Sequence, residues 1–344
     1  MDLDAEARRR GKNLKILVTR LRYLGDVILT TPACAALKQR YPGAEIHYLA
    51  ERPYADILEG NPSLSGIIGV SRGSCRALET LVTLRRGGFT AAIDLLYNPR
   101  SALTLYLSGI PIRAGGSRRV RRRLYTALFS VPAGTRSAVM HHMEALRIFD
   151  VEPRETLPRV YLSGEEIASG RSLLERTLGI TEGERAIAMH PGGTWPAKRW
   201  APESFGKLAR LVRERLGAKT LVIAGAAERG ISETVCAVAG DAAAALPISG
   251  IRTVASAIAA SGAFVANDGG LLHAAVALAR PTVGIFGPTE PDIWFPYEGK
   301  GPFSLVTRRA SCAPCHRHQC ESLECLDSIT PDEVFRRLEG VLAW

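Results

Sequence analysis

The chain has 344 residues, of which 46% are hydrophobic and 23% charged, and its formal net charge is +10 at pH 7. This composition is ordinary for a soluble globular protein, the length suits two α/β domains better than one, and the positive charge predicts an anionic partner such as a nucleic acid, a nucleotide or an acidic lipid surface. Residues 1–12 contain no apolar run, and no stretch of about 18 residues is free of charges and turn residues, so we expect no secretory signal, no transmembrane helix and a place in the cytosol.

Short apolar runs alternate with helical patterns over residues 14–149, and Gly and Pro turns join them. This alternation predicts βαβ units on a parallel sheet. Pro32 would break a helix interior, so the helix over 27–40 needs Thr31 as a cap with Pro32 in its first turn. We expect strands at 14–19, 45–50, 66–70, 91–96 and 110–114, and helices at 27–40, 53–59, 78–86, 101–107 and 138–149.

Residues 151–163 carry two prolines and predict a linker, after which the alternation starts again. The fold class is therefore α/β, with two Rossmann-like, doubly wound parallel sheets. The expected divisions are a flexible N-terminus (1–13), a first domain (14–160), a second domain (161–328) and a C-terminal helix (329–344). In the second domain we expect strands at 186–189, 220–224, 246–248, 263–266 and 282–286, and helices at 165–178, 202–216, 231–239, 253–260 and 331–342.

The stretch 267–273 follows one of these strands and begins a helix. Amides at a helix start are unpaired and carry the positive end of the helix dipole, so they bind anions, phosphate above all. Asp268 could orient a ligand hydroxyl there, or it could simply cap the helix, and His273 lies about one turn further on. A second loop, residues 190–200, offers the Thr194 hydroxyl and the compact positive charge of Lys198 to the same phosphate. Its two tryptophans either pack the loop down or stack on a ring.

Asp26 follows the first strand of the chain, close to a predicted helix start. An ionised carboxylate beside a reacting hydroxyl can act as a general base. The alternative is a helix N-cap. The chain has no Gly-x-Gly-x-x-Gly after its first strand and no Walker A sequence, so neither a dinucleotide dehydrogenase nor a P-loop enzyme is indicated.

Four cysteines lie close together near the C-terminus, with His316 and His318 among them. Thiolates and imidazoles are ligands for a tetrahedral Zn or Fe site, but the spacing is not that of a standard zinc finger. Metal binding, free thiols and disulfides therefore stay open, and a metal here would be structural. The candidate metal ligands are Cys312, Cys315, Cys320 and Cys325.

Five motifs in this order resemble glycosyltransferase family 9, the ADP-heptose:lipopolysaccharide heptosyltransferases, over residues 14–342. They are 18–27 (VTRLRYLGDV), 190–193 (HPGG), 196–200 (PAKRW), 267–273 (NDGGLLH) and 284–289 (GIFGPT). The PAKRW string is most similar to the heptosyltransferase II branch. Two features depart from the family: Gly269 stands where many relatives have Thr or Ser, and the best-known heptosyltransferases lack the C-terminal cysteines.

The resemblance implies a GT-B architecture, with two Rossmann-like domains facing a cleft and the C-terminal helix packing back on the first domain. It also implies inverting, metal-independent transfer of a heptose from ADP-heptose to a lipopolysaccharide inner-core acceptor, with Asp26 as the general base and no cofactor. The first domain would bind the acceptor and the second the nucleotide sugar. The donor and its phosphates would be bound by Thr194, Lys198, Glu228, Asp268, Gly269, Gly270, Leu271 and His273. The acceptor would be bound by Arg20, Arg22, Arg118, Arg119 and Arg122.

The expected partners are thus a nucleotide-diphosphate sugar, an anionic lipid-linked saccharide and, transiently, the cytoplasmic face of the inner membrane. Alternatives within the class are another nucleotide sugar or another acceptor, and outside it a sugar-nucleotide binding protein or epimerase without transfer activity. A nucleic-acid-binding protein is not favoured, because no recognition helix or aromatic–basic module is present.

Overall fold

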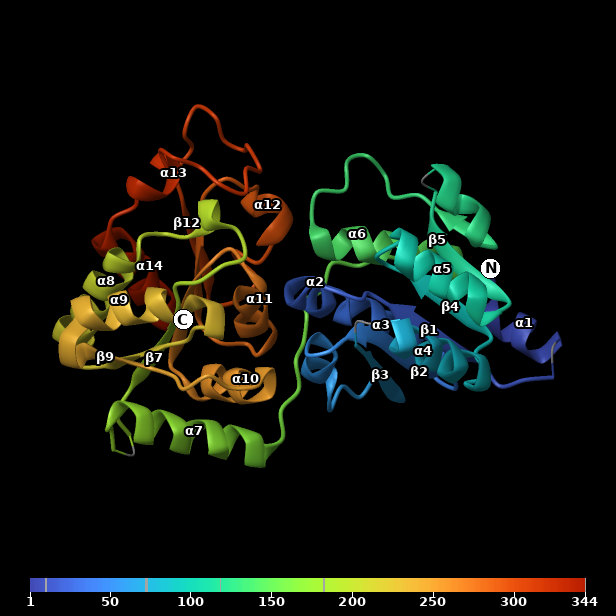
Figure 1. The fold of residues 1–344 in the computed structure, drawn as a ribbon, viewed down its shortest axis with the longest axis horizontal. Helices are drawn as coiled ribbons and strands as arrows, with labels where there is room; N and C mark the ends of the chain where they lie inside the picture. Colours follow the sequence, from blue (N-terminus) through green and yellow to red (C-terminus); the bar gives the residue numbers. More distant parts are fainter. Residues whose placement is uncertain (10, 72–73, 118, 182, 344) are drawn as a thin grey trace. The chain divides into compact units, whose positions relative to one another are not determined.

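A computed structural model describes residues 1–9, 11–71, 74–117, 119–181 and 183–343 (Figure 1). The chain forms two compact units, Met1–Tyr161 and Leu162–Trp344, called here the N-terminal unit and the C-terminal unit. The boundary falls within the predicted linker, where residues 151–163 form neither helix nor strand. Each unit has its own parallel sheet of six strands and is described by itself. Among the described residues, no helix combines the length and the apolar character needed to cross a membrane.

The sheet of the N-terminal unit has the order β3-β2-β1-β4-β5-β6, and all neighbouring strands are parallel. Its central strands are almost wholly buried, which explains why they are continuous apolar runs in the sequence. The edge strand β6 was not predicted. The strands are β1 (Lys15–Thr19), β2 (Glu45–Glu51), β3 (Gly66–Val70), β4 (Ala91–Asp94), β5 (Ile112–Gly116) and β6 (Ala127–Phe129).

The single helix expected over 27–40 is two helices, α2 (Leu24–Leu29) and α3 (Thr31–Arg40), with Thr30 between them. Pro32 lies in the first turn of α3, where its missing N–H has no cost. Because α2 begins at Leu24, Asp26 lies in its first turn and not in a loop. The other helical segments of this unit are η1 (Tyr54–Leu58), α4 (Ser74–Arg86), α5 (Pro99–Ser108), η2 (Arg119–Leu124), α6 (Ala138–Glu144) and η3 (Ala145–Phe149).

The N-terminus, expected to be flexible over residues 1–13, contains helix α1 (Leu3–Arg9). Leu3 and Ala7 are buried, and the terminal ammonium donates to the Ile148 carbonyl at 3.0 Å. Acidic residues in the first turn and arginines in the last also complement the helix dipole. Buried apolar contacts therefore order a segment whose charged sequence suggested a solvated tail.

The sheet of the C-terminal unit has the order β12-β11-β10-β7-β8-β9, again all parallel. The strand predicted at 246–248 is wrong: β9 lies at Ala243–Ala245, since Pro247 has no N–H for a ladder. Strand β12 was not predicted. The strands are β7 (Ala186–His190), β8 (Lys219–Val222), β9 (Ala243–Ala245), β10 (Ala263–Asn267), β11 (Thr282–Phe286) and β12 (Phe303–Thr307).

Strands β7 and β10 pair side by side, so the loops that follow them leave the same edge of the sheet. These loops are the two that the sequence predicts to bind one phosphate group. The helical segments of the C-terminal unit are α7 (Gly164–Leu178), η4 (Pro196–Lys198), α8 (Pro202–Leu216), η5 (Ala226–Glu228), α9 (Arg229–Ala239), η6 (Gly240–Ala242), α10 (Ile251–Ala260), α11 (Gly270–Ala277), α12 (Pro291–Trp294), α13 (Glu324–Asp327) and α14 (Pro331–Leu342).

The final helix α14 packs within the C-terminal unit, against α8 and strands β10, β11 and β12. The expectation that this helix packs back on the N-terminal domain stays a prediction. Its apolar stripe at i, i+4 and i+7 faces the core of its own unit, where Val334, Phe335, Leu338 and Val341 are buried. Phe335 is fully buried and its ring also lies under the Arg215 guanidinium.

Replacing Phe335 with Ala should therefore lower the free energy of unfolding of the C-terminal unit by about 3–5 kcal/mol, the usual cost of a cavity left by a buried ring. All four tryptophans of the sequence lie after residue 162, so tryptophan fluorescence during denaturant unfolding reports on this unit. The control is Arg337→Ala on the exposed side of the same helix. An equal effect of both substitutions would contradict the packing of α14.

Candidate functional site

Asn267, at the end of β10, holds both ends of the 190–200 loop. Its side-chain amide donates to the carbonyls of Pro191 (2.8 Å) and Gly192 (3.1 Å), and its oxygen accepts from the Trp200 amide (3.1 Å). The side chain is 1% exposed, so these hydrogen bonds are shielded from water. Asn267 therefore fixes the path of one loop against the strand end from which the other begins.

Asp268 is the next residue and carries a nearly buried carboxylate. Its Oδ2 accepts from the Lys198 ammonium at 2.6 Å and from the Thr289 hydroxyl at 2.6 Å. The ammonium also lies 4.4 Å from the centre of the Trp195 ring. Since a buried charge is tolerated only when paired, Asp268 and Lys198 hold each other in place. The structure thus brings together the lysine and the aspartate that the sequence predicts as one site.

Helix α11 begins directly beside this pair. Gly269 is its N-cap residue, and Gly269, Gly270 and Leu271 are half-buried at the helix start. Added carbon at Gly269 would meet only the Asn267 carbonyl, at 3.7 Å, so the site has room for the hydroxyl that Gly269 lacks. His273 lies deeper in the helix, where it is buried and its Nδ1 is 3.2 Å from the Tyr297 hydroxyl.

Glu228, in the turn before α9, is predicted to hold a ribose. Its carboxylate accepts from the amides of Gly193 (2.8 Å) and Gly225 (2.9 Å), and one oxygen lies 3.3 Å from His190 Nε2. The bond to His190 is the largest of the contacts that lower the pKa of Glu228 to about 2. A Cβ at Gly192 would lie 2.2 Å from this carboxylate, so the close approach requires glycine. Glu228 thus organises the loop, and its ribose contact stays a prediction.

Thr194 is exposed at the outer end of the same loop. Trp200, in contrast, is 1% exposed and donates through Nε1 to the Ile329 carbonyl at 3.1 Å. Of the two interpretations of the tryptophans, packing is correct for Trp200. Trp195 is half-buried and stacks on an aromatic ring of the protein, that of His318, with centroids 4.0 Å apart.

The cysteine segment, residues 312–325, packs on the 190–200 loop and on the loop that follows β11. Through His318 it covers Trp195, and the His318 carbonyl accepts from the Ala197 amide at 3.1 Å. On the other side, the amides of Cys315 and His316 each donate to the Pro288 carbonyl at 3.1 Å, next to Thr289. The segment therefore supports the two stretches that hold Lys198 and Asp268.

No three His, Cys, Asp or Glu side chains among the described residues are grouped so that they could hold an ion. Cys325 packs into the apolar core with Leu326, and burial, together with the nearby thiols of Cys312, Cys315 and Cys320, raises the pKa of its thiol. Cys312, Cys315 and Cys320 lie nearer the surface as free thiols. A structural Zn or Fe at Cys312, Cys315, Cys320 and Cys325 stays a prediction.

In the N-terminal unit, Asp26 follows β1 at the carboxyl end of the sheet. One carboxylate oxygen pairs with the Arg20 guanidinium, and the other accepts from the Tyr23 amide at 3.2 Å. Arg20 also donates to the Leu95 carbonyl at 2.9 Å. Arg20 therefore orients Asp26, a role that differs from the predicted acceptor contact. The Asp26 side chain keeps 17% of its surface exposed, and its role as a general base stays a prediction.

The remaining predicted acceptor residues are only partly described. Arg22 is half-buried, with its guanidinium 5.6 Å from the centre of the Tyr23 ring. Arg122 is exposed on η2. Arg118 and the side chain of Arg119 lie outside the described residues. No contact between the described ones, Arg22 and Arg122, and Asp26 supports one continuous acceptor site.

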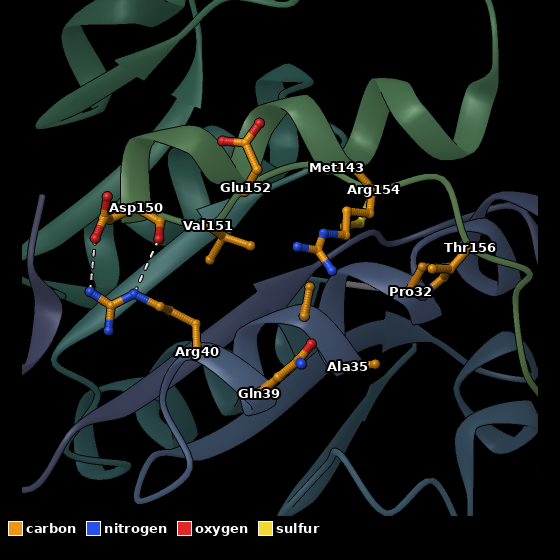
Figure 2. Close-up of a pocket in the computed structure, with 11 residues that line it drawn as sticks. Pro32, Ala35, Gln39, Arg40, Met143, Asp150, Val151, Glu152, Arg154 and Thr156 are labelled. Carbon is orange, nitrogen blue, oxygen red and sulfur yellow. Dashed lines mark hydrogen bonds and ion pairs between the residues drawn. The ribbon is translucent and has the colours of Figure 1, made fainter.

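Figure 2 shows a hollow of about 450 Å³ in the N-terminal unit, between α3 and the chain that follows η3. It contains none of the predicted site residues. Its charges are of both signs: Arg40 is hydrogen-bonded to Asp150, and both Arg154 and Glu152 belong to its lining. The hollow therefore lacks the concentrated positive charge that a diphosphate needs. It is lined by Pro32, Ala35, Ala36, Gln39, Arg40, Met143, Asp150, Val151, Glu152, Arg154 and Thr156.

Several residues of the site escaped prediction. Thr289 lies within the family motif at 284–289, but nothing in the spacing links its hydroxyl to Asp268. The contact of His318 with Trp195 joins positions more than 120 residues apart in the sequence. Asn267 was part of the predicted stretch, yet its role at both ends of the other loop depends on the pairing of β7 with β10.

Comparison with known proteins identifies relatives over the whole fold. A model of glycosyltransferase family 9 (heptosyltransferase) matches residues 78–326. Lipopolysaccharide heptosyltransferase 1 of Pseudomonas aeruginosa is 26% identical over 362 residues, which covers 96% of this chain and 98% of that protein. The structure of E. coli ADP-heptose lps heptosyltransferase II superposes with a TM-score of 0.81 at 23% identity, covering 96% of this chain and 99% of the other. E. coli heptosyltransferase WaaC with ADP-2-deoxy-2-fluoro heptose gives a TM-score of 0.72 at 19% identity, with 95% and 99% covered.

The low pKa of Glu228 predicts a pH-dependent contribution to stability. A carboxylate whose pKa is about 2 in the folded chain, against an ordinary 4.5, stabilises the fold fully above pH 4.5 and loses this effect as the pH falls toward 2. Glu228→Gln should therefore lower the free energy of unfolding by on the order of 1.5–3 kcal/mol near pH 7. In denaturant titrations the difference from the wild type should shrink below pH about 4.5. The control is Glu233→Gln, at an exposed position of α9, for which we expect no such pH-dependent difference. If the free energies of unfolding of the wild type and Glu228→Gln differ by the same amount down to pH about 3, the stabilising role of the Glu228 carboxylate is contradicted.

Proposed function

We propose that this chain, which belongs to glycosyltransferase family 9 (heptosyltransferase), moves a heptose from ADP-heptose to a lipopolysaccharide inner-core acceptor. The transfer is proposed to invert the configuration at the anomeric carbon. The enzyme class follows from the family, whereas the donor, the acceptor and the stereochemistry belong to the proposal. The similarity to lipopolysaccharide heptosyltransferases supports it, as does the structural match to E. coli heptosyltransferase WaaC with ADP-2-deoxy-2-fluoro heptose.

The observation that carries the proposal is the paired Lys198 and Asp268 beside the start of α11. When a glycosyl bond to a nucleoside diphosphate breaks, negative charge accumulates on the leaving β-phosphate. A fixed ammonium and unpaired helix-start amides stabilise that charge without reorganisation. On donor binding, Lys198 exchanges part of its contact with Asp268 for a phosphate oxygen, and Asp268 becomes free to accept from a hydroxyl of the donor.

Asp26 supplies the other half of the reaction. It accepts the proton of the acceptor hydroxyl as that oxygen attacks the anomeric carbon, while the bond from this carbon to the diphosphate oxygen breaks and ADP leaves. Arg20 and the Tyr23 amide hold the carboxylate in one orientation, which lowers the entropy that the transition state must lose. Positive charge for the leaving group comes from Lys198 and the helix start, so the proposal assigns no metal to catalysis.

The acceptor and the location follow from the same proposal. A lipid-linked saccharide of the inner core is anionic and membrane-bound, and exposed Arg122 on η2 provides a counter-charge. We therefore place the enzyme in the cytoplasm, peripherally at the inner membrane. A family-9 transferase with a different nucleotide sugar or acceptor is the alternative, and so is a sugar-nucleotide binding protein without turnover.

The donor class can be tested by thermal shift. ADP should raise the free energy of unfolding by about 2.7 kcal/mol over that of the ligand-free protein at a concentration 100 times its Kd. At equal concentration, UDP and GDP should stabilise the protein less. Lys198→Ala should raise the Kd for ADP by about tenfold or more, since a charge-assisted contact is lost. Lys207→Ala, an exposed lysine on α8, is the matched control and should bind ADP like the wild type. Equal stabilisation by all three nucleotides would favour another donor.

The base can be separated from donor binding. Asp26→Asn keeps the shape of the side chain and an oxygen for the Tyr23 amide, but cannot accept a proton. We expect transfer to fall by about 10²–10⁴-fold, measured as ADP release with lipopolysaccharide precursor present, while the ADP thermal shift stays unchanged. Asp56→Asn, which alters a surface ion pair with Arg52, should keep full turnover. Substantial turnover by the Asp26→Asn variant would refute the role of this carboxylate as the base.

A further inference from the structure

We propose that one face of the N-terminal unit docks the protein on an anionic lipid surface. This face, called the α4–α5 face, consists of Leu78, Val82, Arg85 and Arg86 of α4, Leu103, Tyr106 and Leu107 of α5, Arg121–Arg123 of η2, and Leu128 of β6. The inference deepens the proposed function, because an acceptor carried by a lipid must be met at a membrane.

Apolar side chains concentrate on this face. Of the ten large hydrophobic residues that are exposed in the described part of the chain, six belong to it. Leu78 is 64% exposed, and Leu103 and Tyr106 are each 48% exposed. Exposed apolar residues that occur singly are normal, but a contiguous group marks an interaction surface.

The helical spacing shows that these side chains point outward from a well-packed helix pair. In α5, Ala102 and Leu105 are buried in the core, while Leu103, Tyr106 and Leu107 lie at i, i+3 and i+4 on the opposite side. An amphipathic helix needs only one apolar stripe for its own core, and the second stripe of α5 lies outside that core, with each of its residues 42–48% exposed.

Helices α4 and α5 form one continuous surface. They pack side by side (Figure 1) and share a core cluster through Leu84 and Leu105. The Arg85 Nε donates to the Leu107 carbonyl at 3.1 Å and so ties the end of α5 to α4. On the other side of α5 lies η2, and the Arg113 guanidinium of β5 is 5.6 Å from the centre of the Tyr106 ring.

The charge around the apolar residues is predominantly positive. The sequence from residue 95 to residue 143 contains eight arginines and no Asp or Glu. Arg122 and Arg123 are exposed, and neither forms an ion pair with a described residue. Glu79 is the one carboxylate on α4. The α4–α5 face thus combines leucines and a tyrosine with unpaired guanidinium groups.

Among possible occupants, an anionic bilayer matches both properties. Leucine and tyrosine side chains enter the interface between headgroups and acyl chains, and each nearby arginine adds about 1 kcal/mol of attraction to an anionic leaflet. A second copy of this chain would place arginines against arginines across a symmetric contact. Nucleic acid would leave the leucines without a partner.

Vesicle co-sedimentation of the full chain tests the proposal. The protein should bind vesicles of phosphatidylglycerol and phosphatidylcholine, bind pure phosphatidylcholine at least about tenfold less well, and lose affinity as salt rises. Arg122→Gln with Arg123→Gln should weaken binding to the anionic vesicles by about tenfold or more. The control with the same charge change is Arg336→Gln with Arg337→Gln, on the exposed side of α14, for which we expect less than about a twofold effect.

The apolar contribution is tested by Leu103→Ser with Leu107→Ser, and its control is Ile248→Ser, an exposed apolar residue of the C-terminal unit. The double variant should bind anionic vesicles at least about tenfold less tightly than the wild type, and should keep the melting temperature and the ADP thermal shift of the wild type.

Vesicle binding that is insensitive to salt, or that is equal for the variants of the α4–α5 face and their controls, would overturn the proposal. Dimerisation abolished by the Leu103 and Leu107 substitutions would also overturn it and assign the face to self-association. Loss of the ADP response with intact vesicle binding would instead refute the proposed function alone.

Discussion

The buried charge of Asp268 is the constraint on which the C-terminal site depends. A carboxylate that is 5% exposed must be paired, and two groups from distant parts of the chain meet this requirement, the Lys198 ammonium and the Thr289 hydroxyl. Satisfying one charge therefore fixes the relative positions of the loops that follow β7, β10 and β11. The lysine is held as a cation at the start of α11 before any ligand arrives, so the free energy needed to order it is spent during folding and not during binding.

Around this pair, buried polar side chains determine backbone paths, while the groups suited to meet a ligand stay accessible. Asn267 and Glu228 bind backbone atoms of the 190–200 loop, and Asn267 is fully shielded from solvent. Thr194 and the half-buried Gly270 and Leu271 lie at the open side. Asp26 follows the same principle in the N-terminal unit, where Arg20 is fixed by Leu95 and in turn orients the carboxylate. Ligand-facing groups are thus positioned by residues that themselves need no ligand contact.

The sequence allowed the fold class and the closeness of the 190–200 and 267–273 stretches to be predicted, because apolar periodicity and glycine turns are local signals. It predicted less well wherever tertiary contacts override local patterns. Strands β6 and β12 lie at sheet edges, and β6 has only three residues, so its periodicity is weak. Helix α1 has a charged sequence but is ordered by Leu3 and Ala7. The amphipathic pattern of α14 predicts that the helix packs on a core, but it does not identify α8 and strands β10, β11 and β12 as its partners. Roles such as that of His318 beside Trp195 depend on contacts that no spacing encodes.

The late position of these contacts has a consequence for synthesis on the ribosome. The N-terminal unit is complete by residue 161, so it can fold while the rest of the chain is still being made. The loop that bears Lys198 is bound at Ala197 by the His318 carbonyl and at Trp200 by the Ile329 carbonyl, and the core beneath it is closed by α14. For more than a hundred residues of further translation, therefore, the lysine loop exists without its supports. A nascent or prematurely terminated chain would carry a folded first unit and an unfinished second one, with β7 and β10 apolar and exposed to chaperones until the last helix emerges.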